Sequence, residues 1–157
     1  MAVLEIHTAG DPVLKTVCAP VARVDKKIKR TLKDMADTLY ASHNGIGLAA
    51  PQVGILKRLI VIDLQDGTGL RELVNPVITN KEGSQIFTEG CLSVPNFEGD
   101  VERAEYVEVE YTDGRGQRQF LKADGLLAVC LQHEMDHLDG ILFTDKAVTI
   151  MPKAPED

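Results

Sequence analysis

The spacing of hydrophobic positions separates two helices from a central block of strands. Between residues 26 and 42, apolar side chains recur every three or four positions, with Lys and Asp on the other face. Asp25 stands where a helix N-cap is expected. The pattern therefore predicts an amphipathic helix over residues 26–42. Residues 1–24 are broken by glycine and proline and are predicted to be extended and rich in loops.

The middle of the chain carries shorter apolar runs and alternating patterns, which are typical of strands. Residues 101–112 alternate most clearly, with valines and a tyrosine on one face and acids on the other. Asp-Gly-Arg-Gly at 113–116 is typical of a hairpin turn. The remaining predicted strands cover residues 58–64, 70–78, 84–88 and 117–122, with a turn at 80–84.

A second helix is predicted over residues 124–138, closed by Asp139 and Gly140. The order of elements predicts an α+β fold, with mostly antiparallel strands packed around a central C-terminal metal-binding helix and one N-terminal helix. A length of 157 residues corresponds to a single catalytic domain over 1–157. Residues 146–157 are expected to form a loosely ordered tail, with no C-terminal helix.

Composition narrows the class of protein. The net charge of −7 disfavours a nucleic-acid partner, and no apolar run is long enough for a membrane span. The N-terminus lacks the basic region of a signal peptide. The three cysteines are odd in number and lack the regular spacing of a disulfide pattern, which indicates a reducing compartment. These features predict a cytoplasmic protein without membrane partners.

The second predicted helix contains the pattern His133-Glu134-x-x-His137. Residues i and i+4 share one face of a helix, so both imidazoles can reach one metal ion. Glu134 lies at the edge of that face, where it can accept a proton from a water on the metal. A helix with two unrelated histidines is the structural alternative.

A catalytic metal usually has three protein ligands, and the third is not obvious here. Only twenty residues follow His137, and they contain neither His nor Cys. We therefore expect an upstream ligand, from His43, Cys18, Cys91 or an acid. Cys91 is favoured because it ends a predicted strand on a short segment before a proline. Cys130, three residues before His133, is a weaker alternative, and spacing alone leaves the choice open.

The loop after the first helix and the start of the second carry further candidate residues. Residues 45–52 form a tight, small-residue loop that contains Gly45, Gly47 and Gln52. The apolar residues Leu126, Val129 and Cys130 precede His133 by seven, four and three positions. They are expected to form an apolar wall beside the metal, with ordinary core packing as the alternative.

Three stretches together resemble the signature motifs of the peptide deformylases, in the order of that family. They are Gly-Ile-Gly-Leu-Ala-Ala-Pro-Gln at 45–52, Glu-Gly-Cys-Leu-Ser-Val-Pro at 89–95 and Gln-His-Glu-Met-Asp-His-Leu at 132–138. The resemblance extends over residues 5–145. It implies a metal-dependent hydrolase that removes the N-formyl group from the N-terminal formyl-methionine of nascent polypeptides.

The resemblance also implies roles for individual residues. Cys91, His133 and His137 would hold Fe²⁺, which Zn²⁺, Ni²⁺ or Co²⁺ can replace. Glu134 would act as general acid and base for a metal-bound water. The Gln52 side chain and the Leu92 backbone N–H would stabilise the oxyanion. A merely structural role in its loop is the alternative for Gln52.

The substrate contacts implied by the resemblance lie beside the metal. The peptide would lie along Ile46 and Gly47, next to Gly45, and add to a sheet edge. Its methionine side chain would fill a pocket that Ile46, Leu126, Val129, Cys130 and the His133 ring form. Glu89 would support the metal site from behind and tie its loop in place.

Two departures from the family pattern affect expected partners. Many bacterial members carry a basic residue where this chain has Glu98, which leaves the contacts beyond the first substrate residues open. The C-terminal helix that some members use at the ribosome is expected to be absent, which weakens the expectation of transient ribosome association. Another small metallopeptidase and a non-catalytic metal-binding homologue are the alternative functions.

Overall fold

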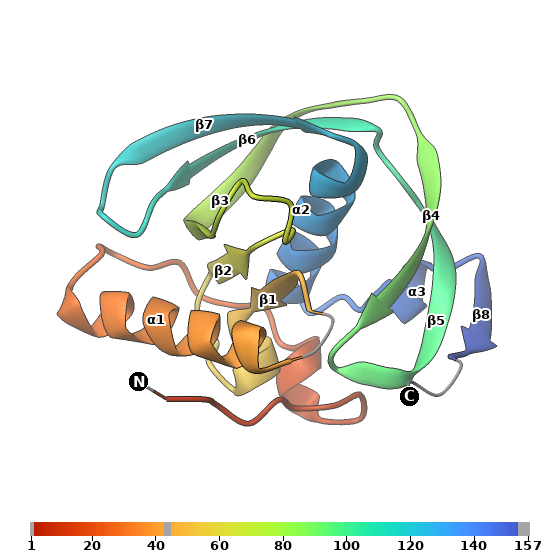
Figure 1. Ribbon diagram of the computed structural model, residues 1–157, viewed down its shortest axis with the longest axis horizontal. Coiled ribbons are helices and arrows are strands. Elements are labelled where there is room, and N and C mark those ends of the chain that lie inside the picture. Colours follow the sequence, from red (N-terminus) through yellow and green to blue (C-terminus); the bar gives the residue numbers. More distant parts are fainter. Residues whose placement is uncertain (1, 43–44, 154–157) are drawn as a thin grey trace.

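A computed structural model describes residues 2–42 and 45–153 of the chain. In Figure 1 the long C-terminal helix lies at the centre of the molecule, with the sheets and the other helices around it. In chain order the elements are η1 (Pro12–Lys15), α1 (Lys26–Ala41), β1 (Gly47–Ala49), η2 (Ala50–Val53), β2 (Leu59–Ile62), β3 (Arg71–Glu82), β4 (Gln85–Cys91), β5 (Val94–Arg103), β6 (Tyr106–Thr112), β7 (Arg118–Asp124), α2 (Gly125–Leu138), α3 (Phe143–Lys146) and β8 (Thr149–Pro152).

The strands form two antiparallel sheets. The larger sheet has the order β1-β2-β3-β6-β7, and the smaller has the order β4-β5-β8. β1 and β4 are therefore each at the edge of a sheet. The fold class predicted from the sequence, α+β with mostly antiparallel strands around a C-terminal helix, is confirmed.

The two long helices pack on opposite faces of the larger sheet, and β2 explains why. Leu59 and Val61 belong to the core cluster that contains the apolar face of α1. Ile60 and Ile62 belong to the cluster that contains α2. Because successive side chains of a strand point to opposite faces, this run of four apolar residues is buried on both sides.

α1 begins and ends close to the predicted positions. The Asp25 carboxylate accepts a hydrogen bond from the Ile28 amide at 2.9 Å, as an N-cap does. α2 is different, because its burial is not confined to one face. Ten of its fourteen residues are buried, among them His133, Glu134 and His137. The helix that carries the metal pattern is therefore a central element of the core (Figure 1).

The predicted single strand over residues 101–112 is wrong, because the chain forms β5 and β6 there, in different sheets. The strand is interrupted after Arg103. The Gln132 side chain accepts a hydrogen bond from the Ala104 amide at 3.1 Å and donates one to the Ala104 carbonyl at 2.9 Å. A side chain from α2 thus replaces a strand partner at the crossing between the sheets.

Several other boundaries differ from the prediction. β3 continues to Glu82, so the predicted turn at 80–84 is confined to Gly83 and Ser84. β4 is longer than the predicted strand over 84–88 and reaches Cys91. The expectation of a loosely held tail is wrong for Thr149–Pro152, which forms β8 and pairs with β5. This pairing covers an edge of β5 that would otherwise lack backbone hydrogen-bond partners.

Candidate metal centre

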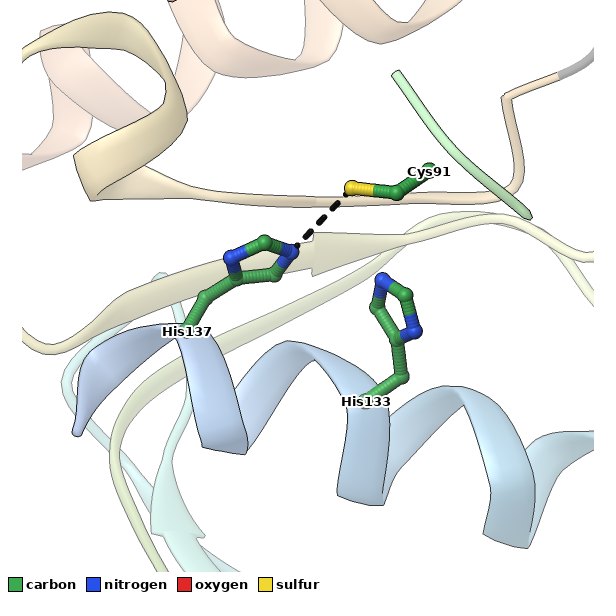
Figure 2. Close-up of side chains that lie close together, drawn as sticks. All are labelled: Cys91, His133 and His137. Carbon is green, nitrogen blue, oxygen red and sulfur yellow. Dashed lines mark hydrogen bonds between the residues drawn. The ribbon is translucent and has the colours of Figure 1, made fainter. Parts of the chain in front are cut away.

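One turn of α2 places two imidazoles side by side, and the end of β4 brings a thiol to meet them. His133 and His137 are 7% and 1% exposed. The Cys91 sulfur lies 3.3 Å from His137 Nε2. One ligand atom from each of the three residues lies within 4.8 Å of the others. Figure 2 shows both rings rising from α2 toward the Cys91 side chain.

The donor set fits a transition-metal cation. His133 donates from Nδ1 to a Glu89 carboxylate oxygen at 2.8 Å, which leaves its Nε2 free for a metal. The pKa of His137 lies well below its usual value, because burial and the nearby positive charges oppose protonation. A neutral imidazole is the form that binds metal. One thiol and two imidazoles leave further coordination positions for water or substrate.

The other upstream candidates for the third ligand do not join this group. Cys18 is buried in the core cluster between α2 and the larger sheet. Cys130 is buried beside the site, and burial raises the pKa of its thiol well above the usual value. A thiol in this state is a poor ligand. His43 lies outside the described residues. Among the described candidates, only Cys91 meets both histidines.

A buried ion-pair network holds His133 in place. Arg103 donates to both Glu89 carboxylate oxygens, at 2.6 and 2.9 Å, and to Asp136 at 2.8 Å. Burial opposes the negative charge of Glu89, but the hydrogen bonds from His133 and Arg103 outweigh it and lower its pKa. Glu89 is therefore a charged acceptor behind the His133 ring. It also ties the strand that carries Cys91 to α2.

Glu134 lies next to the metal ligands in a closely packed position. It is 5% exposed, and its Oε1 atom has no hydrogen-bond partner among the described residues. Burial raises the pKa of Glu134 to about 7. A Cβ atom added at Gly47 would lie 2.6 Å from Glu134 Oε2 and 2.9 Å from the Cys130 sulfur. Position 47 therefore requires glycine, because any larger side chain there would collide with the Glu134 carboxylate.

Gln52 has a fixed orientation that points its amide N–H₂ group at the site. Its Oε1 atom accepts a hydrogen bond from the Ala49 amide at 2.9 Å. Its Nε2 atom donates to the Ser93 hydroxyl at 3.1 Å and faces the Cys91 sulfur at 3.4 Å. Leu92, the next residue after Cys91, lies in the turn between β4 and β5. The loop at 45–52 and the turn after β4 therefore meet at the thiol.

A cavity of about 730 Å³ opens beside these groups. It lies between the edge strands β1 and β4, with α2 at its base. Every residue predicted for substrate binding or catalysis lines it, namely Gly45, Ile46, Gly47, Gln52, Glu89, Leu92, Leu126, Val129, Cys130 and Glu134. Cys91 and His133 line it as well. Leu126 is 43% exposed, whereas Val129 and Cys130 are buried, so the apolar wall runs from the surface to the metal ligands.

The sequence pattern did not single out several residues that shape the site. Arg103 carries the ion-pair network, and the Phe143 ring stacks on His133 with ring centres 6.0 Å apart. Phe87 and Asn96 line the cavity, as does Glu98, whose charge was noted from the sequence. In the strand predicted over residues 101–112, Arg103 falls on the same face as the valines. Only its burial and its hydrogen bonds to Glu89 reveal its role.

His7 is not one of the three residues of the metal-ligating group. Its Nδ1 atom lies 2.6 Å from an Asp11 carboxylate oxygen. Residues i and i+4 meet here around the short η1 segment. Among the described residues, no helix combines the length and apolar character that crossing a bilayer requires.

Comparison with known proteins identifies the family of this chain. The family model described as Polypeptide deformylase matches residues 3–153. A peptide deformylase of Acetivibrio thermocellus is 53% identical over 148 residues, which cover 94% of this chain and 85% of the relative. One of Pelotomaculum thermopropionicum is 48% identical over 157 residues, covering 100% of this chain and 99% of the relative.

Solved structures show the same fold. The crystal structure of a peptide deformylase from Synechococcus elongatus, in complex with actinonin, has a TM-score of 0.88 and 50% identity, covering 93% of this chain and 79% of that one. That of Thermotoga maritima has a TM-score of 0.90 and 37% identity, covering 95% and 100%. With this agreement in sequence and in fold, the chain belongs to the polypeptide deformylase family.

Proposed function

We propose that Cys91, His133 and His137 hold a divalent cation, natively Fe²⁺ and replaceable by Zn²⁺, Ni²⁺ or Co²⁺, for removal of the formyl group from formyl-methionyl peptides. The support is the convergence of three donor atoms beside a cavity that the Glu134 carboxylate and the Gln52 amide line. Mixed sulfur and nitrogen donors suit these metals better than Mg²⁺ or Ca²⁺. The cation would supply Lewis acidity and lower the pKa of a water molecule.

Glu134 is proposed to move the proton. Its Oε1 atom, which has no hydrogen-bond partner in the described part of the chain, can accept a proton from the attacking water. The water oxygen adds to the formyl carbon, and Glu134 then returns the proton to the amine nitrogen as the carbon–nitrogen bond breaks. The products are formate and a free N-terminal amine. A pKa of about 7 suits both the uptake and the release of this proton.

The Gln52 amide and the Leu92 backbone N–H are proposed to stabilise the developing oxyanion. The Gln52 donor group is held by the Ala49 amide on its other side, so it needs no reorganisation during the reaction. A fixed donor of this kind typically contributes about 3–4 kcal/mol to the barrier. Ser93 and Cys91, its present neighbours, keep it on the side of the metal ligands.

The cavity supports a linear peptide whose first residue is methionine. Two free sheet edges, β1 and β4, border the cavity, and an extended chain can pair with such edges. Ile46, Leu126, Val129 and Cys130 offer the apolar wall for the methionine side chain. Gly45 and Gly47 keep the reacting end narrow, which favours the small formyl group over larger acyl groups. We also propose that actinonin binds in this cavity, in line with its binding to the Synechococcus elongatus relative.

The test is formate release from formyl-Met-Ala-Ser, with Fe²⁺ or Zn²⁺ added under anaerobic conditions. Wild type should release formate, and Glu134→Ala should lower kcat by about 10²–10⁴-fold. Glu110→Ala, an acid exposed on β6, is the control and should keep full activity. Retention of activity by Glu134→Ala would remove the proposed proton acceptor.

The same assay separates the alternative functions. Cleavage of the unformylated peptide by wild type would indicate a small metallopeptidase. Metal binding without formate release would indicate a non-catalytic homologue. Formylated chains arise at the ribosome, so we propose a cytoplasmic location and a transient association with ribosomes.

A further inference from the structure

The exposed side of α1 carries a concentrated positive charge. Six of the 17 lysines and arginines lie between residues 23 and 33, with Asp25 as the only acid there, although the chain has a net charge of −7. All six side chains are exposed, and in residues 2–42 and 45–153 none of them forms an ion pair. This basic face of α1 consists of Arg23, Lys26, Lys27, Lys29, Arg30 and Lys33.

Helix stability does not account for these charges. The amide end of a helix favours acids, yet α1 starts with Lys26 and Lys27 and has no acid in its first turn. The apolar side of α1 is already buried against β1 and β2. The lysines therefore face solvent at a helix end where their own charge is disfavoured. A partner with negative charge would relieve that repulsion.

The basic face of α1 also borders a hollow in the surface. Lys29, Arg30 and Lys33 line a hollow of about 500 Å³ together with Ala2 and Asp34. The spacing from Lys26 to Lys33 covers two helical turns, or about 10 Å along the helix axis. A row of cations over that distance can contact successive phosphates of one strand. Of the residues that the structure describes, Asp34 is the only one that lines the hollow with a carboxylate.

The location of the basic face keeps the reaction site accessible. The N-terminal end of α1 is remote from β4 and β5 (Figure 1). The catalytic cavity lies beside those two strands. A large polyanion on the first turns of α1 would leave the cavity mouth open. The enzyme could then be held near its substrates without blocking their entry.

We propose that the basic face of α1 docks on the phosphate backbone of ribosomal RNA. Naming ribosomal RNA rests on the proposed function, because the substrate is the N-terminus of a chain that the ribosome has just made. An anionic membrane fits less well, since residues 23–33 expose no large apolar side chain that could insert. The expectation of no nucleic-acid partner came from the net charge, whereas binding depends on the local charge.

The test compares two triple variants that lose the same charge. Lys29→Gln/Arg30→Gln/Lys33→Gln removes the centre of the basic face. Arg115→Gln/Arg118→Gln/Lys122→Gln removes three exposed cations of the β6–β7 hairpin and is the matched control. Lys29→Arg/Lys33→Arg keeps the charge. Binding to purified bacterial ribosomes, to a mixed-sequence 30-nucleotide RNA and to phosphatidylserine vesicles is measured between 50 and 200 mM salt, with formate release as a separate readout.

The α1 triple variant should bind ribosomes and RNA at least about tenfold more weakly, with a salt slope shallower by about 2. The hairpin and arginine variants should bind like wild type, and all proteins should release formate equally. Equal loss in both triple variants, absence of wild-type binding, or preference for vesicles would overturn the docking proposal. Loss of formate release in every protein would instead contradict the proposed function and leave the binding comparison intact.

Discussion

The contact between Gly47 and Glu134 makes the sharpest prediction about catalysis. In Gly47→Ala the new methyl group would lie 2.6 Å from Glu134 Oε2, against an ordinary contact distance of at least 3.4 Å. Gly47 is not among the residues with positive φ, so alanine brings no backbone strain and acts only through space. Either the carboxylate or β1 must move by about 0.8 Å.

The expected loss follows from that displacement. A misplacement of about 1 Å at a catalytic group costs roughly 100-fold in rate, or about 2.7 kcal/mol of barrier. Crowding of the core should lower the free energy of unfolding by about 1–3 kcal/mol. The two effects are measured separately, by kcat for formate release and by urea unfolding of the metal-loaded protein.

Two further variants isolate the cause. Gly90→Ala is the matched control, because an added Cβ at Gly90 meets no atom within 4 Å among the described residues beyond its two chain neighbours. Its stability should change by less than about 0.5 kcal/mol. In a Glu134→Ala background, Gly47→Ala should lose at least about 0.5 kcal/mol of its destabilising effect, because the main clash is gone. Wild-type kcat and stability in Gly47→Ala would refute the inference that Gly47 holds the carboxylate in position.

Three other predictions concern the ligands and the surface. Arg103→Leu leaves the buried Glu89 carboxylate without its cation. It should lower the free energy of unfolding by about 3–5 kcal/mol, as measured by urea unfolding. It should also weaken metal affinity about 10–100-fold, as measured by chelator competition. Cys91→Ser should lose the bound metal during dialysis that wild type survives, as measured by elemental analysis; tight retention would exclude Cys91 as a ligand. The hydrogen bond to Asp63 raises the pKa of Tyr40 to about 12. The stability that this bond contributes should therefore be complete below pH 10 and lost between pH 10 and 12. Tyr40→Phe should abolish the tyrosine ionisation step at the highest pH in an absorbance titration.

Local patterns predicted the elements that depend on local forces. The spacing of apolar residues and the Asp25 cap located α1, and the His-Glu-x-x-His spacing placed two imidazoles on one face of α2. Strand positions were predicted less well than helix positions. The break between β5 and β6 depends on Gln132, which is distant in sequence, and β8 depends on an available edge of β5. No local sequence pattern predicts contacts of this kind.

The amino-acid sequence alone was thus enough to predict the fold class, the helix with its two histidines and, through three motifs in order, the family. How these parts meet depends on tertiary contacts. It places Cys91 against His137, joins Glu89 to Arg103 and His133, and brings Gly47 against Glu134. It also shows that the six lysines and arginines between residues 23 and 33 are all exposed. The physical reason is that coordination, ion pairing and close packing act over a few ångströms in space, between residues that are far apart along the chain.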